Sequence, residues 1–183
     1  IVTELTEVQA KQGDGYVAGF TRKRKDTTIV DGKEIFPEIM RGEIRSAGFD
    51  LNGCWVPLYN WHKLFAGLFD VDTHCGGNAR AISVAVGLGG YIEKVFNALS
   101  DEQVQTVLDC EHGGINESFA ELYARTKDQR WLKLAQRIYH KRVLDPLTAQ
   151  RDELAQRHAN TQVPKLIGLA RLHELTGSAD NAT

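Results

Sequence analysis

The chain has 183 residues, of which 42% are hydrophobic and 25% are charged, and its formal net charge is −2. These values are ordinary for one soluble globular domain. The near-neutral charge gives no general attraction to nucleic acid or to an anionic membrane, and no apolar run is long enough to span a bilayer.

Three cysteines, Cys54, Cys75 and Cys110, are widely spaced along the chain. Their odd number and the lack of a Cys-x-x-Cys motif exclude a disulfide framework and a self-contained zinc knuckle. We expect buried free thiols. The basic run Thr21–Lys25 is typical of a solvated loop.

The N-terminal part differs from the rest of the chain. Residues 1–12 predict a short helix, whereas residues 13–53 are glycine-rich, polar and aperiodic. We therefore expect residues 1–55 to form an irregular segment with one short helix and a few short extended pieces.

From residue 56 onward the apolar spacing predicts one helix after another. A clear spacing of three and four covers residues 59–71, and Gly76–Asn78 breaks it. A long apolar helix is predicted over 79–99, and a cap at Ser100 and Asp101 predicts the next helix. Further helices are predicted over 115–126, 128–144, 145–156 and 162–176, the third of these beginning near Pro146.

The last of these helices has its own start signals. Asn160 and Thr161 are good N-cap residues, and Pro164 fits a first turn because its missing N–H costs nothing there. His158 therefore lies just before a helix start.

A faint internal repeat links these helices. Leu122 and Thr126 align with Leu172 and Thr176 at a shift of 50 residues. Repeats of this length, each made of two helices, indicate stacked α-hairpins, either as an open solenoid or as a closed α/α toroid. The last hairpin has only one arm, so we expect the chain to be a fragment of a longer domain.

Three histidines occupy equivalent places in this repeat. His62 and His112 are 50 residues apart, and His112 and His158 are 46 apart, each near a predicted helix start. In a toroid the inner helices run in the same direction, so the three imidazoles would gather at one mouth of the central funnel. Imidazole binds sugar hydroxyls, moves protons near neutral pH and ligates metals.

The other polar residues that are candidates for a functional site do not follow the repeat spacing. His140 and His173 are out of register and are expected at the surface or rim, and the stretch from Asp70 to Cys75 is expected to be a polar helix end. Glu111 and Glu117 flank the stretch that begins with His112, and each is a candidate to face the same cavity. Glu117 is explained by the dipole of a first helical turn alone, and Asp14 is a turn signal.

The motifs together resemble the bacterial β-L-arabinofuranosidases of glycoside hydrolase families 127 and 146. The resemblance lies in Trp-x-Pro-x-Tyr-x-x-His-Lys (55–63), Glu-His-Gly-Gly-x-Asn-Glu (111–117) and His-Ala-Asn-Thr-x-x-Pro-Lys (158–165), in that order. It extends over nearly the whole chain from Gly13 and is closer to the second of the two families.

The resemblance implies an (α/α)6 barrel and the release of terminal β-L-arabinofuranosyl units from plant-derived glycans with retention of configuration. It implies that His62, His112 and His158 contact the sugar. Weaker candidates for the same role are Tyr59, Asn60, Glu111, Asn160 and Asp14.

The family nucleophile is a cysteine thiolate on a zinc ion, held by a Glu-x-Cys motif and a later Cys-Cys pair. Neither motif occurs here, and the acid/base glutamate would also lie past Thr183. We therefore expect no catalytic residue, no metal ligand and no cofactor in this chain, with zinc in the full-length site.

The combined interpretation is an all-α chain whose residues 56–183 form about half of an (α/α)6 barrel. It is expected to bind carbohydrate, to be inactive alone, to bind neither nucleic acid nor membrane, and to self-associate through the exposed barrel face. Two alternatives stay open. One is an α/α-toroid sugar isomerase or epimerase that uses paired histidines. The other is a non-catalytic helical-repeat binding module.

Overall fold

The computed structural model describes residues 1–178 of the chain. The N-terminal helix α1 (Val2–Gln12) ends at Gly13, which takes a left-handed conformation with φ 74°. Five short antiparallel strands follow, joined in the order β2-β1-β5-β4-β3. They are β1 (Thr21–Lys23), β2 (Ile29–Asp31), β3 (Ser46–Ala47), β4 (Asp50–Leu51) and β5 (Cys54–Trp55).

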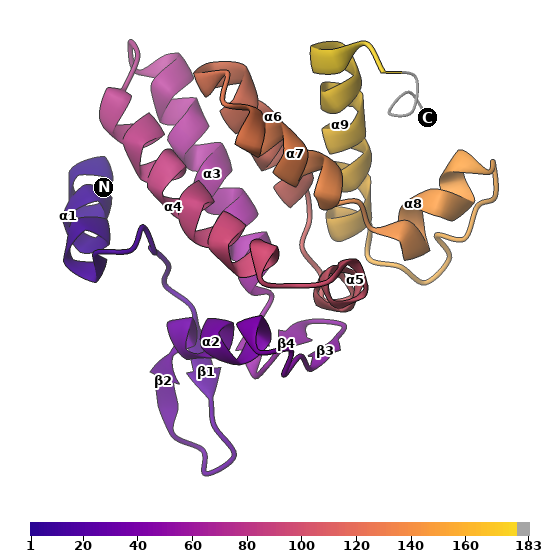
Figure 1. The fold of residues 1–183 in the computed structure, drawn as a ribbon, viewed down its shortest axis with the longest axis horizontal. Coiled ribbons are helices and arrows are strands. Elements are labelled where there is room, and N and C mark those ends of the chain that lie inside the picture. Colours follow the sequence, from indigo (N-terminus) through magenta and orange to yellow (C-terminus); the bar gives the residue numbers. More distant parts are fainter. Residues whose placement is uncertain (179–183) are drawn as a thin grey trace.

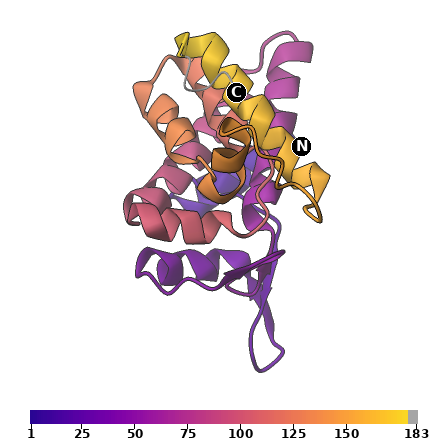
Figure 2. The same ribbon diagram turned by 90° about the vertical axis from the view of Figure 1, so that its right-hand side faces the viewer.

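The short extended pieces expected in this part of the chain are therefore present, but two helical pieces within it were not predicted. The 3-10 turn η1 (Gly32–Glu34) leads into α2 (Ile35–Met40), which buries Ile35, Phe36 and Ile39. The six residues of α2 are too few to show a helical period in a glycine-rich sequence. The strands and α2 lie at one end of the helical layers, with the β1–β2 hairpin pointing away from them (Figures 1 and 2).

Seven helices follow in the described part of the chain. They are α3 (Pro57–His74), α4 (Ala79–Asn97), α5 (Asp101–Leu108), α6 (Ile115–Thr126), α7 (Gln129–Arg137), α8 (Lys141–Thr148) and α9 (Ala159–Thr176). The predicted cap of α5 is confirmed as a capping box, in which Ser100 and Gln103 exchange side-chain and backbone hydrogen bonds. None of the helices in residues 1–178 is long and apolar enough to cross a membrane.

The helices pack as hairpins. α3 pairs with α4, and α6 pairs with α7. α3, α6 and α9 follow one another across the molecule and run in the same direction, with their N-terminal ends on the side of α5 and the strands (Figure 1). The predicted all-α fold of helical hairpins is confirmed, while closure into a six-hairpin barrel stays a prediction.

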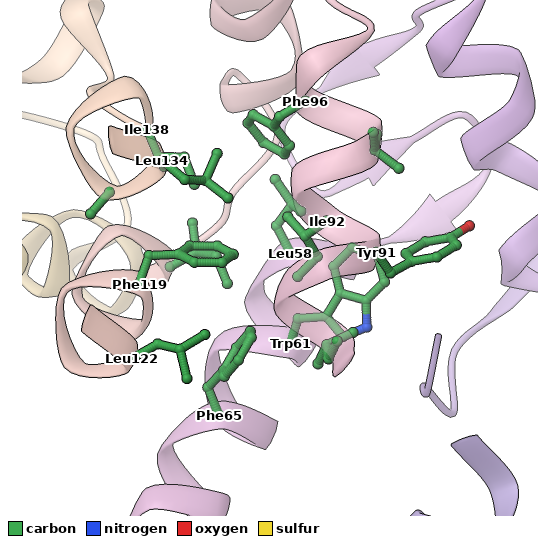
Figure 3. Close-up of a cluster of buried hydrophobic side chains, with 14 of the residues drawn as sticks. Leu58, Trp61, Phe65, Tyr91, Ile92, Phe96, Phe119, Leu122, Leu134 and Ile138 are labelled. Carbon is green, nitrogen blue, oxygen red and sulfur yellow. The ribbon is translucent and has the colours of Figure 1, made fainter. Parts of the chain in front are cut away.

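The core lies between the two hairpins. Figure 3 shows Leu58 and Phe65 of α3 and Ile92 and Phe96 of α4 facing side chains of the second hairpin, while Trp61 lies beside Tyr91. These partners are Phe119, Leu122, Leu134 and Ile138, and all of the labelled side chains are buried. The 3–4 spacing that predicted α3 thus marks the face that is buried.

Two predicted helices between residues 128 and 156 were wrong. The helix predicted over 128–144 ends at Arg137, and a new one starts at Lys141. At the break, Nε2 of Gln105 donates to Tyr139 O (2.9 Å), and the N–H of Lys141 donates to Oε1 of Gln105 (2.9 Å). A side chain far away in the sequence therefore satisfies the backbone groups that a continuous helix would pair internally.

The helix predicted over 145–156 does not exist. Pro146 is inside α8 rather than at a start, and residues 149–158 form turns and irregular chain. The predicted caps of the last helix were also wrong: its N-cap is His158, and Asn160 and Thr161 belong to its first turn.

Candidate functional site

The three histidines in repeat register lie near the N-terminal ends of α3, α6 and α9. His158 is the N-cap of α9, and His112 lies in the loop before α6. His62 is in the second turn of α3, because α3 begins at Pro57, two residues earlier than predicted. The register predicted from sequence spacing thus places the three residues at one end of parallel helices.

Glu111 and His158 form a pair in this region. Nδ1 of His158 lies 3.0 Å from Oε2 of Glu111, as expected for a ring N–H that donates to a carboxylate. The side chain of Glu111 is 13% exposed, and that of His158 is 50% exposed. The N–H of Glu111 donates to Gly48 O (2.8 Å), which fixes the loop between α5 and α6 against the N-terminal strands.

The pair borders a hollow of about 360 Å³ that opens between three loops and the start of α9. Its rim carries Phe49, whose ring meets the His158 imidazole edge-on at 5.9 Å. The polar and charged residues that line the hollow are Asp109, Glu111, His140, Arg142, Gln156, Arg157, His158, Gln162 and Lys165.

His112 lies beneath this hollow and does not line it. The side chain is buried, with Nδ1 3.1 Å from Cys110 O, and its ring lies 5.2 Å from the ring of His140. Burial lowers the pKa of both histidines, so their imidazoles are neutral at neutral pH.

His140 was expected at the surface, and that expectation was wrong. It is 5% exposed, and Nε2 lies 3.4 Å from Oδ1 of Asp109. The break between α7 and α8, where His140 is the N-cap of α8, turns the ring inward. A continuous helix through 144 would have left the residue in mid-helix, which is why the sequence pattern failed.

Lys165 is a functional candidate that the sequence analysis missed. Its residue exposure is 2%, and Nζ lies 2.9 Å from Nδ1 of His140 and 2.8 Å from Oε1 of Gln162. Burial lowers the pKa of Lys165 to about 7. A signal existed in the sequence, because Lys165 shares a helix face with the apolar residues Leu169 and Leu172 at spacings of four and seven.

His62 belongs to a neighbouring cluster that joins α3, α6 and α9. Its Nδ1 accepts the N–H of Gly114 (3.2 Å), and its Nε2 lies 3.8 Å from Oε2 of Glu117. A Cβ on Gly114 would lie 3.0 Å from Nε2 of His62 and 3.0 Å from Cβ of Pro164. The Gly-Gly step after His112 is therefore what lets the loop approach both helices.

Tyr59 is brought to the same cluster. Its ring meets the His62 imidazole at 6.1 Å. A Cβ on Gly113, whose φ is +57°, would come within 2.9 Å of the Tyr59 ring.

Asn60 and Asp14 are not placed at the hollow beside Glu111. Nδ2 of Asn60 donates to the carbonyls of Trp55 (3.2 Å) and Val56 (3.0 Å) and so supports the start of α3. Asp14 pairs with Nζ of Lys33 at 2.9 Å. Each lines a different hollow, so neither shares a cavity with the Glu111–His158 pair. Asn160 is exposed on the first turn of α9, two residues from His158.

The cysteines do not fit the zinc-thiolate centre that the resemblance implies. Cys54 and Cys110 are buried, and burial raises the pKa of each thiol to about 12, which disfavours the thiolate that zinc binds. Cys75 is exposed. Among residues 1–178, no three or more histidine, cysteine, aspartate and glutamate side chains are grouped to hold a metal ion.

No curated protein matches the chain. A family model described as beta-L-arabinofuranosidase, GH127 catalytic domain, matches residues 1–183. The chain, with its parallel helices and the histidines at their N-terminal ends, therefore belongs to this glycoside hydrolase family.

Proposed function

We propose that this chain supplies part of the sugar site of a retaining glycoside hydrolase that removes terminal β-L-arabinofuranosyl units from plant-type glycans. Membership of the family supports the reaction class. The observation that carries the proposal is the Glu111–His158 pair, held at 3.0 Å on the wall of a hollow of about 360 Å³. Pockets for small molecules are about 300 Å³ or larger.

The pair offers both kinds of hydrogen bond that a sugar needs. The carboxylate of Glu111 accepts from a hydroxyl, and the half-exposed imidazole of His158 donates to one or accepts from one. Phe49 at the rim adds an apolar surface for a furanose ring. His140 lines the hollow with a buried ring, and the ring of His112 packs against it from outside the lining, so both support this wall.

His62 and Tyr59 extend the proposed contact surface toward α3. They contact the loop 111–114 at Gly113 and Gly114, where Pro164 of α9 also lies close. In this proposal the chain alone binds sugar without cleaving it, since Cys54 and Cys110, among residues 1–178, are buried thiols that burial disfavours as nucleophiles. Its residues orient the sugar, and its cysteines take no part.

The test is a calorimetric titration of the chain with methyl β-L-arabinofuranoside. We expect binding by the parent chain and at least about tenfold weaker binding by Glu111→Gln and by His158→Ala, because each loses a hydrogen bond to a charged or polar partner. Glu153→Gln is the matched control, since Glu153 is an exposed carboxylate on the loop between α8 and α9 and does not line the hollow.

Three results would count against the proposal. Equal affinity of Glu111→Gln, His158→Ala and the parent chain would remove the hollow from sugar binding. Equal affinity for the α-anomer would remove the stated specificity. Conversion of L-arabinose to another sugar by the chain would favour the isomerase alternative.

A further inference from the structure

Lys165 occupies a position that the proposed contact residues do not explain. It lies in the second turn of α9, and its long side chain points into the protein rather than to solvent. A buried ammonium group is costly unless polar partners surround it. The two partners of Nζ, His140 and Gln162, are both neutral, so no carboxylate contacts this charge directly.

The hydrogen bond from Lys165 determines which ring nitrogen of His140 carries the proton. Because Nζ donates to Nδ1 of His140, that ring carries its proton on Nε2, which faces Oδ1 of Asp109 at 3.4 Å. The ring of His112 packs against the ring of His140, with 5.2 Å between the ring centres. The ammonium group of Lys165 thus joins α9 to His140 at the junction of α7 and α8. His140 in turn contacts Asp109, at the end of α5.

Charges on two segments act on Lys165. Asp109 and Glu111 follow α5 and favour the protonated amine, while Arg157, just before α9, disfavours it. His140 and His112 are the titratable neighbours, and both stay neutral. α6 contributes an uncharged contact, from Nδ2 of Asn116 to Lys165 O at 3.0 Å.

Lys165 and Glu111 line the same hollow. The positive charge of Lys165 and the carboxylate of Glu111 attract each other, and that carboxylate in turn accepts the N–H of His158. Loss of the proton from Lys165 would weaken this arrangement without removing any group from the wall.

We propose that Lys165 is a positioning residue of the sugar site, which orients His140 from below and supplies the positive charge that keeps Glu111 and His158 in their sugar-binding arrangement. The inference rests on the proposed function. It makes sugar affinity depend on the protonation of a group that does not itself contact the sugar. Since the pKa of Lys165 is about 7, affinity should fall as the pH rises through neutrality.

The test compares the parent chain, Lys165→Met and Lys165→Arg by titration with methyl β-L-arabinofuranoside between pH 6 and pH 9. We expect the parent to lose about tenfold in affinity across this range. Lys165→Met should bind weakly at every pH, and Lys165→Arg should bind at high pH as the parent does at low pH, because guanidinium stays charged. Lys133→Met, on the exposed face of α7, is the matched control.

A second readout does not depend on sugar. Nitrogen NMR of the histidine rings should place the proton of His140 on Nε2, with a change of its signals near pH 7 in the parent that is absent from Lys165→Met. His140 signals that ignore the substitution would overturn the inference, whether or not sugar binds. A flat pH profile of sugar affinity, with Glu111→Gln and His158→Ala still impaired, would overturn it while leaving the proposed function in place.

Discussion

At the scale of single residues, the two buried histidines near the hollow are neutral and hydrogen-bonded. His112 donates to a backbone carbonyl, and His140 lies between Lys165 and Asp109. Nδ1 of His112 and both ring nitrogens of His140 have partners, so burial removes little of their hydrogen bonding. The cost falls instead on the charged forms, which burial disfavours.

This cost predicts a loss of stability in acid. The pKa values of His112 and His140 lie below the ordinary value of 6.5, so below pH 6.5 the unfolded chain takes up protons that the folded chain does not. The free energy of unfolding should then fall by about 1.4 kcal/mol per pH unit for each such histidine. Urea denaturation at pH 7, 6 and 5 measures this fall.

The control for this experiment separates buried from surface histidines. His140→Gln should remove part of the pH dependence. His173→Gln should leave it unchanged, because His173 is only partly buried near the end of α9 and contacts Ser178 O at 2.8 Å. Identical pH slopes for the parent and His140→Gln would show that His140 is already protonated or solvated in the folded chain.

Repeat spacing predicted that His62, His112 and His158 lie near helix starts, whereas their role as sugar contacts stays a prediction. The repeat pointed to His112 and His158, and the flanking position pointed to Glu111, which the structure pairs with His158. Asp14 was expected at the sugar site but lies at a different hollow, where it pairs with Lys33. Lys165 was missed although it lies on an apolar helix face, a pattern that indicates a buried charge.

At the scale of helices, the periodic segments were predictable and the junctions were not. The apolar spacing placed α3, α4, α6 and α9, because each buries one continuous stripe. The stop between α7 and α8 depends on the amide of Gln105, which is 34 residues before Tyr139. Local sequence holds no signal for such a contact.

The packing of α6 against α9 gives a prediction at this scale. Gly168 faces Asn116, and a Cβ there would overlap the side-chain amide that donates to Lys165 O. Gly168→Ala should therefore lower the free energy of unfolding by about 1–3 kcal/mol, as overpacking does. Chemical denaturation measures the change.

Gly90 in α4 provides the matched control. A Cβ there meets nothing within 4 Å, so Gly90→Ala should raise the free energy of unfolding by about 0.5–1 kcal/mol through helix propensity alone. If both variants are stabilised, α9 does not pack against α6 as closely as described.

At the scale of the whole molecule, the arrangement of α3, α6 and α9 leaves apolar side chains in the open. Val163 and Ile167, one turn apart on α9, are each 50% exposed. In the predicted barrel a further helix would cover this face. Exposed apolar patches of this kind favour association, so we expect the chain to self-associate as its concentration rises.

Light scattering over a concentration series tests this expectation. The double substitution Val163→Lys and Ile167→Lys should hold the chain as a monomer, because it places two charges on the exposed face of α9. Val8→Lys should not, since Val8 is 45% exposed but lies on α1 at the opposite side of the molecule from α9 (Figure 1). A parent chain that stays monomeric at the highest concentration, or that associates equally well with both lysines in place, would mean that the face of α9 needs no cover.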